Sequence, residues 1–478
     1  KRLLPAAQRS PETKTVIAME TVLDSALGIR IVSWGDTLDQ GRTVPEEVDA
    51  GLAKLQRTHT ACIIYTSGTG GRPKGVMLSH GAILSNCKGA NTLLSGLPDY
   101  ASGSEVFLSF LPLSHSYEHT AGQFFPISIG AQIYYTAGLD KLVADMATAQ
   151  PTIMTAVPRL YETIYGRIMR GVTQSKGVPK LLFLKTLDIG HRARTSPETL
   201  SLGDRALNPL LTMLVRRKVA KRFGGRLKAF VSGGAPLNPE IGEFFLALGV
   251  RILQGYGQTE SAPVISCNPV APIKIETVGP PLEDVSVRIA EDGEILVQGE
   301  LVMQGYWNNK SATDAAIQEN WLHTGDIGEV DSDGYIRITD RKKDIIVNSG
   351  GDNLSPQRVE GMLTIEPEIA QAMVHGDKRP YIVALIVPDP DFVKEWSAEY
   401  GDANDPNLSL TQTAFQTVIA AAVKRVNDKL NNIERVRRFH LIPESFTTDN
   451  EMMTPSMKIR RHVINERYGA DLERLYGG

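Results

Sequence analysis

The stretch LKAFVSGGAPLNPEIGEFFLALGVRILQGYGQTE, from Leu227 to Glu260, contains a complete strand–helix–strand unit. An apolar run predicts the first strand, Asn238 predicts a helix cap in front of a proline, and a second apolar run predicts the next strand. Glycine-rich turns are expected after both strands, at Ser232–Pro236 and at Gly255–Glu260. Because α/β sheets bind ligands at the carboxyl ends of their strands, both turns are candidate binding segments.

The same alternation of strand-like and helical patterns continues through most of the first 340 residues and favours layered, parallel α/β structure. From about Val278 the pattern changes to short strands separated by Gly/Asp turns, as at Glu291–Gly293 and Asp331–Gly334. A mixed pattern follows the basic run Arg341–Lys343. We therefore predict an α/β fold with a large N-terminal domain at 1–340, which includes a small β-rich subdomain at 278–340, and a small mobile α+β C-terminal domain at 341–478. Within that last domain we expect a helix at Pro356–Leu363, a strand at Tyr381–Val387 and an amphipathic helix from Thr411 to about Leu430.

Composition narrows the class of protein. The chain has 478 residues and a net charge of −3, from 51 basic and 54 acidic side chains, which argues against nucleic acid as a partner. Three scattered cysteines offer neither a disulfide framework nor metal-type spacing, and this favours a cytoplasmic protein. No apolar run approaches the ~20 residues of a membrane span, so any membrane contact is expected to be peripheral. The start KRLLPAAQRS has neither an initiator Met nor a signal-like core, which suggests an internal start.

The stretch YTSGTGGRPKGVMLSH, from Tyr65 to His80, is a candidate phosphate-binding loop. Its glycines let backbone N–H groups converge on an anion, while nearby hydroxyls and Lys74 add donors and charge. The spacing fits neither the Walker loop nor the dinucleotide fingerprint. A mobile Gly/Ser linker with a basic tip is the alternative.

Six motifs in one order carry a family resemblance: TSGTGGRPKG, SGGAPL, GYGQTES, WLHTGDIG, TDRKKDIIVNSGGDNLSP and TPSMKIRR. Together they resemble the adenylate-forming ligases, which include acyl-CoA synthetases, luciferases and the adenylation domains of peptide synthetases. The resemblance covers nearly the whole chain. The stretch from VPRLYETIYGRIMRGV through RRKVAKRFGGRLKAFVSGGAPLNPEIGEFF looks most like the long-chain fatty acyl-CoA synthetases.

The resemblance implies an enzyme that joins a fatty acid to AMP with release of pyrophosphate and then transfers the acyl group to coenzyme A. Its expected substrates are a fatty acid, ATP and coenzyme A, with Mg²⁺ as cofactor. An enzyme that hands acyl-AMP to a carrier protein, and a nucleotide-binding protein without activity, remain as alternatives. Only 64 residues precede Tyr65. Family members have a longer region there, so we expect the upstream part to be missing or shortened. Because of its apolar and basic content, the segment from Tyr161 to Phe223 is expected to shape acyl or membrane access.

The resemblance also assigns the nucleotide-binding residues. Tyr256 resembles the aromatic residue that stacks on adenine, although plain core packing is its alternative role. Gly70 stands where the family usually has Ser or Thr, so one hydroxyl donor is lost. The residues matching the phosphate loop are Thr66, Ser67, Gly68, Thr69, Gly70, Gly71 and Lys74, and those matching the adenine pocket are Gly233, Gly234, Ala235, Pro236, Gly255, Tyr256, Gly257 and Gln258.

Acidic and basic residues further along match the reacting part of the family site. Thr259 and Glu260 resemble the pair that meets phosphate and Mg²⁺, with Thr66 as a second metal contact. Asp326 resembles the carboxylate that accepts the ribose hydroxyls, and Arg341 the guanidinium beside it. Without the shared motif order, the Glu would be an exposed side chain, the Asp part of a turn and the Arg part of a solvated face.

The remaining candidates concern catalysis and movement. Lys458 resembles the late catalytic lysine, whose charge bridges a carboxylate and a triphosphate that repel each other. His115 matches a family histidine that lies near substrate and ATP. The stretch His115-Ser116-Tyr117-Glu118-His119 is also an inverted zinc-protease pattern. A purely structural role for the histidine is a further alternative. Lys343 matches the family hinge, and Gly350 and Gly351 are expected near the pantetheine arm of coenzyme A.

The hinge interpretation predicts different behaviour for two substitutions at Lys343. Lys343→Pro fixes φ near −65° and removes an N–H, so the variant should still form acyl-AMP while acyl-CoA production falls steeply. Lys343→Ala loses the same charge but keeps the backbone free, and should retain most of both activities. Separate assays of the two half-reactions measure this; coenzyme A turnover by Lys343→Pro at the parental rate would place the pivot elsewhere.

Overall fold

The computed structural model describes residues 4–20, 28–42, 45–66, 73–138, 140–342, 344–400, 410–454 and 458–477. The chain divides into two compact units, residues 1–59 and 60–478. The first unit contains the parallel strand pair β1–β2 and three helices. Its elements are α1 (Leu4–Gln8), β1 (Thr15–Ala18), β2 (Arg30–Ser33), α2 (Trp34–Gly41) and α3 (Pro45–Leu52).

A six-stranded sheet is the centre of the second unit, with strand order β10-β9-β8-β7-β5-β6. The five strands from β9 to β6 in this order run parallel, and β10 closes one edge antiparallel. The strands are β5 (Val106–Ser109), β6 (Gln132–Tyr135), β7 (Ile153–Ala156), β8 (Ala229–Ser232), β9 (Ile252–Gly257) and β10 (Val264–Cys267).

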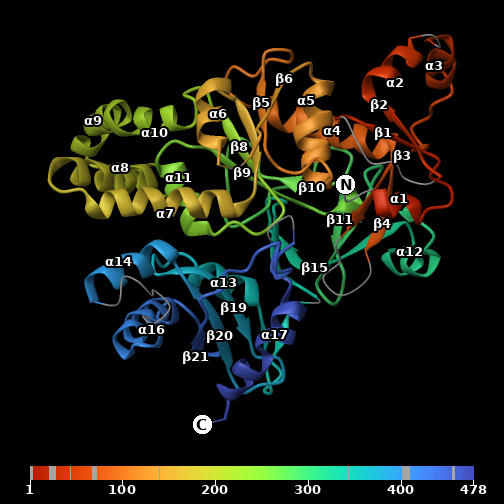
Figure 1. Ribbon diagram of the computed structural model, residues 1–478. Coiled ribbons are helices and arrows are strands. Elements are labelled where there is room, and N and C mark those ends of the chain that lie inside the picture. The colour runs from red at the N-terminus through yellow and green to blue at the C-terminus, as the bar shows by residue number, and fades with distance from the viewer. Residues whose placement is uncertain are drawn as a thin grey trace. The chain divides into compact units, whose positions relative to one another are not determined.

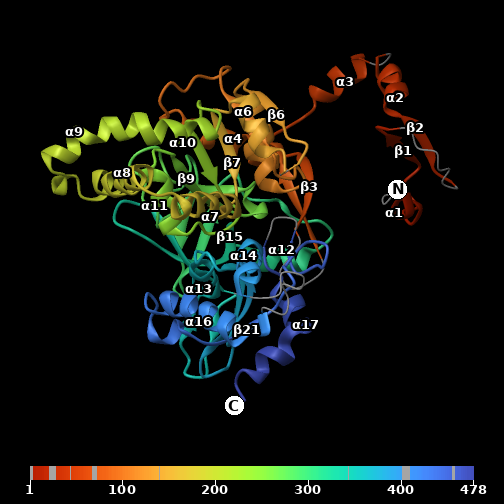
Figure 2. The ribbon, with the colours of Figure 1, turned by 60° about the vertical axis from the view of Figure 1, so that its left-hand side comes forward.

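Helices cover both faces of this sheet (Figures 1 and 2). Phe230 and Phe245 belong to the core on one face, whereas Ile83, Phe107 and Phe125 belong to the core on the other. The layered α/β prediction is therefore confirmed. The helical elements are α4 (His80–Leu94), the π-helix η1 (Glu118–Phe124), α5 (Phe125–Ser128), α6 (Leu142–Ala149), α7 (Pro158–Gln174), α8 (Val178–Thr195), the 3₁₀ turn η2 (Pro197–Thr199), α9 (Leu202–Leu211), the π-helix η3 (Thr212–Arg216), α10 (Arg217–Arg222) and α11 (Pro239–Ala247).

The strand–helix–strand unit at Leu227–Glu260 forms as predicted, except at its second turn. Asn238 caps α11 by accepting a hydrogen bond at Oδ1 from the Glu240 N–H, at 2.8 Å. The predicted turn at Gly255–Glu260 is wrong in its first half, because β9 continues to Gly257 and only then meets the 3₁₀ turn η4 (Thr259–Ser261). Pairing with β10 extends the strand, and it needs glycine at 257 because a Cβ there would lie 1.8 Å from the Pro263 carbonyl oxygen.

The β-rich part consists of two further sheets that share one core with Tyr256. The Glu291–Gly293 and Asp331–Gly334 turns connect antiparallel strands, as predicted. The first sheet contains β11 (Ser286–Ile289), β12 (Glu294–Gln298), β14 (Ile317–Gln318), β15 (Trp321–Val330) and β16 (Ile336–Arg341). The second sheet contains β3 (Thr60–Thr66), β4 (Lys74–Ser79) and β13 (Gly305–Tyr306). Helix α12 (Lys310–Ala316) follows β13 in the chain.

The C-terminal part has its own sheet, β19-β20-β21, and two apolar cores. The helix predicted at Pro356–Leu363 has those bounds, and the predicted strand and amphipathic helix are present with ends shifted by one to three residues. The domain boundary near residue 341 and the mobility of this part stay predictions. The elements are β17 (Ile346–Val347), β18 (Asn353–Leu354), α13 (Pro356–Leu363), β19 (Ile369–His375), β20 (Ile382–Pro388), α14 (Pro390–Tyr400), α16 (Thr413–Asn427), the 3₁₀ turn η5 (Asn432–Glu434), β21 (Val436–Leu441) and α17 (Arg461–Arg474).

Candidate active site

A buried carboxylate, Asp326 on β15, forms the centre of the candidate site. The Tyr256 hydroxyl donates to its Oδ2 at 2.7 Å, and Arg341 Nε lies 3.0 Å from its Oδ1. Asp326 and Arg341 are direct partners in the β15–β16 ladder, so strand pairing sets their approach. Burial raises the pKa of Asp326, and Arg341, Tyr256 and Lys458 act in the opposite direction. The structure thus brings together the two residues that were predicted to share the ribose.

Lys458 reaches this centre from the C-terminal part of the chain. Its pKa is lowered by burial and by the positive charge of Arg341, while Asp326, Asp344 and Glu260 favour its charged form. Local backbone bonds hold the lysine: its N–H donates to Thr454 Oγ1 at 3.0 Å. The predicted catalytic lysine therefore lies in the electrostatic field of the predicted ribose and metal-binding carboxylates.

Arg461, three residues after Lys458, attaches this segment to the C-terminal core. Its guanidinium makes two bonds to the buried Glu360 carboxylate, at 2.7 and 2.6 Å. Pairing of this kind is strong because the planar fork matches both carboxylate oxygens. The position of Lys458 is thus linked to the fold of the C-terminal part.

Glu260 and Thr259 lie on η4, at the end of β9. The Tyr306 hydroxyl donates to Glu260 Oε1 at 2.8 Å, and Lys74 Nζ lies 4.5 Å from the centre of the Tyr306 ring. Thr259 Oγ1 lies 3.0 Å from the Ser116 hydroxyl oxygen. Tyr306 thus joins two predicted site residues, Lys74 of the β3–β4 hairpin and Glu260 of η4.

The predicted phosphate loop is bounded by a β-hairpin. Strands β3 and β4 pair antiparallel, and Thr66 opposite Lys74 is the last pair before the loop. Ser67, Gly68, Thr69, Gly70 and Gly71 lie outside the described residues, as does the hinge candidate Lys343. Their roles stay predictions.

The Gly233–Pro236 turn follows β8 and packs closely against the residues after His115. A Cβ on Gly233 would lie 3.0 Å from the Tyr117 ring, whose hydroxyl donates to the Val231 carbonyl at 2.7 Å. Gly234 has φ +85°, a conformation that favours glycine. Tyr256 lies mostly in the core, so stacking on adenine stays a prediction beside its packing role.

Gly350 and Gly351 lie in a short hairpin turn between β17 and β18. The Gly350 N–H donates to Asn348 Oδ1 at 2.9 Å, and Gly351 has φ +86°. Both are exposed. Their predicted contact with coenzyme A stays a prediction.

The side chain of Glu118, in the His115–His119 pattern, is fully buried in the core. Its two carboxylate oxygens accept hydrogen bonds from Ser109 at 2.5 Å and Thr155 at 2.6 Å, and burial raises its pKa to about 7. His119 packs edge-to-face on Phe124. This arrangement connects η1 to β5 and β7, which accounts for the glutamate without a zinc ion. His115 Nδ1 accepts from the Tyr117 N–H at 3.3 Å, and burial and the charge of Lys458 lower the pKa of this histidine.

The residues of the site suit a Mg²⁺ ion that arrives with ATP. Among the described residues no cluster of three or more His, Cys, Asp or Glu could hold a metal ion. Glu260 offers one carboxylate, and Mg²⁺ in nucleotide enzymes commonly uses one or two carboxylates together with substrate phosphates. A single carboxylate at Glu260 is thus compatible with a metal-binding role that the phosphates complete, and the metal contacts of Glu260 and Thr66 stay predictions.

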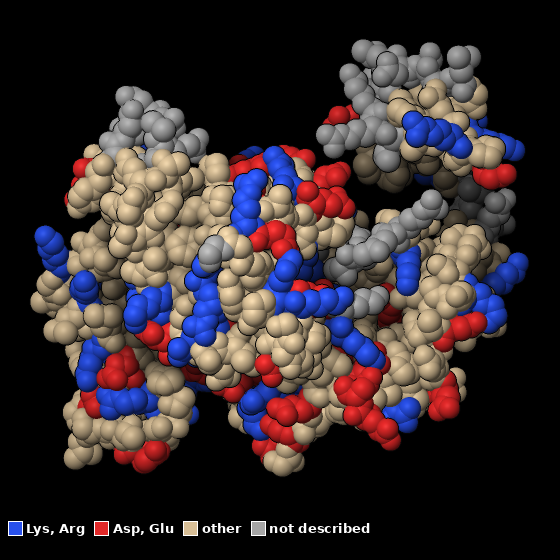
Figure 3. All heavy atoms as spheres, turned by 90° about the horizontal axis from the view of Figure 1, so that it is seen from below, with Lys and Arg blue, Asp and Glu red and all other residues tan. Residues whose placement is uncertain are grey.

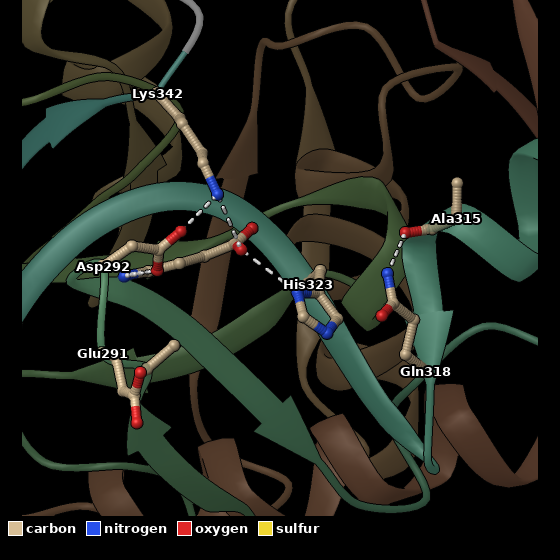
Figure 4. Close-up of a pocket in the computed structure, with 8 residues that line it drawn as sticks. Glu291, Asp292, Ala315, Gln318, His323 and Lys342 are labelled. Carbon is tan, nitrogen blue, oxygen red and sulfur yellow. Dashed lines mark hydrogen bonds and ion pairs between the residues drawn. The ribbon is translucent and has the colours of Figure 1, made fainter.

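An open pocket of about 680 Å³ is lined by residues that include Asp292, His323 and Lys342 (Figure 4). Its side chains meet at Glu294, whose Oε2 lies 3.1 Å from His323 Nδ1 and 3.3 Å from Lys342 Nζ. Glu294 Oε1 accepts from the Gly325 N–H at 2.8 Å, directly before Asp326. This carboxylate thus holds the backbone next to Asp326, the residue predicted to bind ribose.

Sequence reasoning missed several residues of the site, namely Tyr306, Ser116, Tyr117, Asp344 and Glu294. Tyr306 lies 46 residues from Glu260 and far from Lys74 in the chain, so no local spacing pointed to it. Its place in Gly305-Tyr306-Trp307, directly after an apolar run, resembled ordinary strand sequence.

The fold and this constellation define an adenylate-forming enzyme. The profile of the family described as AMP-binding enzyme matches residues 3–307, and that of the AMP-binding enzyme C-terminal domain matches residues 343–478. The chain therefore belongs to the AMP-binding enzyme family, which confirms the resemblance in the sequence.

Curated relatives with similar sequences are named as long-chain fatty acid ligases. The long-chain-fatty-acid–CoA ligase FadD15 of Mycobacterium tuberculosis is 37% identical over 461 residues, which cover 94% of this chain and 73% of that protein. The peroxisomal long chain acyl-CoA synthetase 6 of Arabidopsis thaliana is 30% identical, with coverage of 99% and 69%.

Solved structures agree on the fold. The A domain of the carboxylic acid reductase from Segniliparus rugosus, in complex with AMP and a co-purified carboxylic acid, gives a TM-score of 0.72 at 20% identity and covers 99% of this chain and 73% of that chain. The o-succinylbenzoate CoA synthetase of Bacillus subtilis, in complex with its acyl-adenylate intermediate, gives a TM-score of 0.62 at 20% identity, with coverage of 96% and 79%.

The contacts of Tyr306 predict graded effects of two substitutions. Tyr306→Phe keeps the ring under Lys74 but removes the bond to Glu260, so the KM for Mg²⁺-ATP should rise by about tenfold or more, since one hydrogen bond to a charged group contributes ~1.5 kcal/mol or more. Tyr306→Ala removes both the bond to Glu260 and the ring under Lys74, and should raise the KM for Mg²⁺-ATP further. The KM for fatty acid should change little in Tyr306→Phe. An unchanged KM for Mg²⁺-ATP in both variants would contradict the positioning role.

Proposed function

We propose that the protein is a long-chain fatty acid–CoA ligase that works through an acyl-adenylate. The placement of Lys458 among Asp326, Arg341 and Glu260 is the observation that supports this most strongly, because it is the charge arrangement that the first half-reaction requires. The names of the relatives support fatty acids as the substrate class.

In the first step a fatty-acid carboxylate oxygen attacks the α-phosphorus of ATP, and pyrophosphate leaves. Both reactants are anionic, so fixed cations lower the barrier by stabilising the charge that develops between them. Lys458 would contact both reactants, Asp326 would orient the ribose, and Glu260 would hold the Mg²⁺ carried by the phosphates. When bound, Mg²⁺ neutralises phosphate charge.

In the second step the sulfur of coenzyme A attacks the acyl carbonyl, AMP leaves with the former carboxylate oxygen, and the thiol proton passes to water. Lys458 occupies the site in the present arrangement, so we propose that the C-terminal part rotates about Lys343 between the steps. The polar contacts that would break in that rotation include those of Arg170 to Asp389 and Asp391, Arg159 to the Ala370 carbonyl, Lys429 to Glu240, and Asn238 to the Gly361 carbonyl.

We also propose that the enzyme works in the cytoplasm. The described cysteines are all free thiols, two of them buried, and a reducing compartment preserves that state. No helix among the described residues is long and apolar enough to cross a membrane.

The role of Lys458 can be tested by separating the half-reactions. Lys458→Ala should lower acyl-AMP formation by on the order of a hundredfold or more, since preorganised charge stabilisation is typically worth several kcal/mol. Thioester formation from supplied acyl-AMP should largely survive. Fatty-acid-dependent pyrophosphate release measures the first step, and trapping with coenzyme A measures the second.

The wild-type enzyme and Lys394→Ala, an exposed lysine of α14, are the controls and should behave alike. Equal loss of both half-reactions in Lys458→Ala would indicate a folding defect and not a catalytic role. Absence of pyrophosphate release by the wild type with a graded series of fatty acids would favour a nucleotide-binding protein, whereas release without acyl-CoA would favour transfer to a carrier protein.

A further inference from the structure

The strand that carries Asp326 is irregular at the point where this carboxylate enters the site. In the ladder between β12 and β15 the register shifts between Glu294 and Leu296. One residue of β12, Ile295, therefore lies opposite three residues of β15, 324–326. A bulge of this kind leaves backbone groups without ladder partners and re-aims the side chains next to it. The direction of Asp326 thus depends on how the bulge is held.

Side chains supply the missing partners inside the bulge. Thr324 Oγ1 donates to the Ile295 carbonyl at 2.7 Å and accepts from the Asp326 N–H at 3.1 Å. The Gly325 N–H donates to Glu294 Oε1 at 2.8 Å, and Gly325 has φ +73°, a conformation that favours glycine. The carboxylate of Glu294 thus replaces a hydrogen bond that the strand ladder does not provide.

The second oxygen of Glu294 reaches the neighbouring strand. Lys342 directly follows Arg341, the last residue of β16, and its backbone N–H donates to the Gly325 carbonyl at 2.9 Å. Lys342 Nζ lies 3.3 Å from Glu294 Oε2. A single carboxylate therefore contacts both residues that flank the pair of Asp326 and Arg341.

Burial distinguishes Glu294 from a surface ion-pair residue. On the face seen in Figure 3, Lys/Arg and Asp/Glu are interspersed at the surface, where ion pairs contribute little. The Glu294 side chain is only 8% exposed, and Asp292 gives Lys342 a second, exposed partner at 2.6 Å (Figure 4). Burial opposes the charged form of Glu294, but bonds from His323 and the Gly325 N–H hold its pKa below the usual value. Glu294 therefore stays an ionised acceptor.

We infer that Glu294 is a positioning residue that sets the selectivity of the enzyme for the ribose of its nucleotide. Its carboxylate fixes the bulge at Gly325 and so places Asp326 where a ribose hydroxyl donates to it. The inference rests on the proposed function, in which Asp326 orients the ribose. Reach matters more than charge, because the bond from Gly325 needs an oxygen at the end of a glutamate-length side chain, whereas Lys342 keeps Asp292 as a partner.

Two substitutions separate reach from charge. Glu294→Gln loses the negative charge but keeps an acceptor oxygen at the same distance, so the bond from Gly325 survives. Glu294→Asp keeps the charge but shortens the side chain by about 1.5 Å, so its carboxylate no longer reaches the Gly325 N–H. Glu291→Ala is the matched control, because Glu291 is exposed, lines the same pocket and lies apart from Lys342 (Figure 4).

Calorimetric binding of AMP and of 2′-deoxy-AMP measures the selectivity without turnover. Wild type, Glu291→Ala and Glu294→Gln should bind AMP about tenfold or more tighter than 2′-deoxy-AMP, since a hydrogen bond to a charged group gives discrimination of this size. In Glu294→Asp this ratio should fall by about threefold or more, while the KM for fatty acid stays at the wild-type value. A merely structural role would leave the ratio unchanged.

The possible results separate the inference from the proposed function. Full selectivity in Glu294→Asp, equal loss of selectivity in both Glu294 variants, or equal binding of the two nucleotides by the wild type would each overturn the inference. Fatty-acid-dependent pyrophosphate release by the wild type tests the proposed function. Its absence, together with the expected binding ratios, would remove the ligase activity and leave the selectivity role of Glu294 standing.

Discussion

The organisation of the site depends on one buried carboxylate, Asp326, which has to be compensated from several directions. An unpaired carboxylate at this depth would lose its charge, and its pKa is indeed raised by burial. Tyr256 from the central sheet and Arg341 from the neighbouring strand satisfy its two oxygens, and Lys458 adds a positive charge from the C-terminal part. Tyr256 and Arg341 come from regions that share one apolar core, whereas Lys458 comes from the C-terminal part, which has cores of its own. Segments that are distant along the chain thereby meet at one carboxylate.

Because Asp326 draws Lys458 to the site, the other contacts between the C-terminal part and the rest of the chain can be weak. Arg170 lies 2.6 Å from Asp391, and Lys429 lies 2.9 Å from Glu240, but these pairs are largely solvent-exposed. Exposed ion pairs contribute ~1 kcal/mol or less each, so they can orient the C-terminal part without fixing it permanently. Lys458, which we propose acts in the first half-reaction, is thus brought to the site by a part of the chain with reversible contacts, as the proposed rotation between half-reactions requires.

The sequence was informative where local chemistry decides the structure. Asn238 before Pro239 predicted a helix start, and Pro356–Leu363 predicted a helix with the observed bounds, because capping and proline geometry act within a few residues. The turn expected at Gly255 was wrong because pairing with β10, a tertiary constraint, extends the strand through two glycines. Tyr306 and Glu294 could not be found from the sequence, since their site contacts join segments that are distant along the chain. Motif order placed Asp326, Arg341 and Lys458 in one site, but only the folded strands show how they meet.

Cross-linking the C-terminal part in its present orientation tests the account most directly. In a Cys62→Ser background, Glu240→Cys and Lys429→Cys place two thiols where the native side chains meet, and a short bismaleimide joins them without being reversed by the thiol of coenzyme A. Each single-cysteine variant treated with the same reagent is the matched control. The account predicts that the cross-linked enzyme still releases pyrophosphate and forms acyl-AMP but makes almost no acyl-CoA, while both controls complete the reaction. Acyl-CoA formation by fully cross-linked enzyme at the rate of the controls would contradict it.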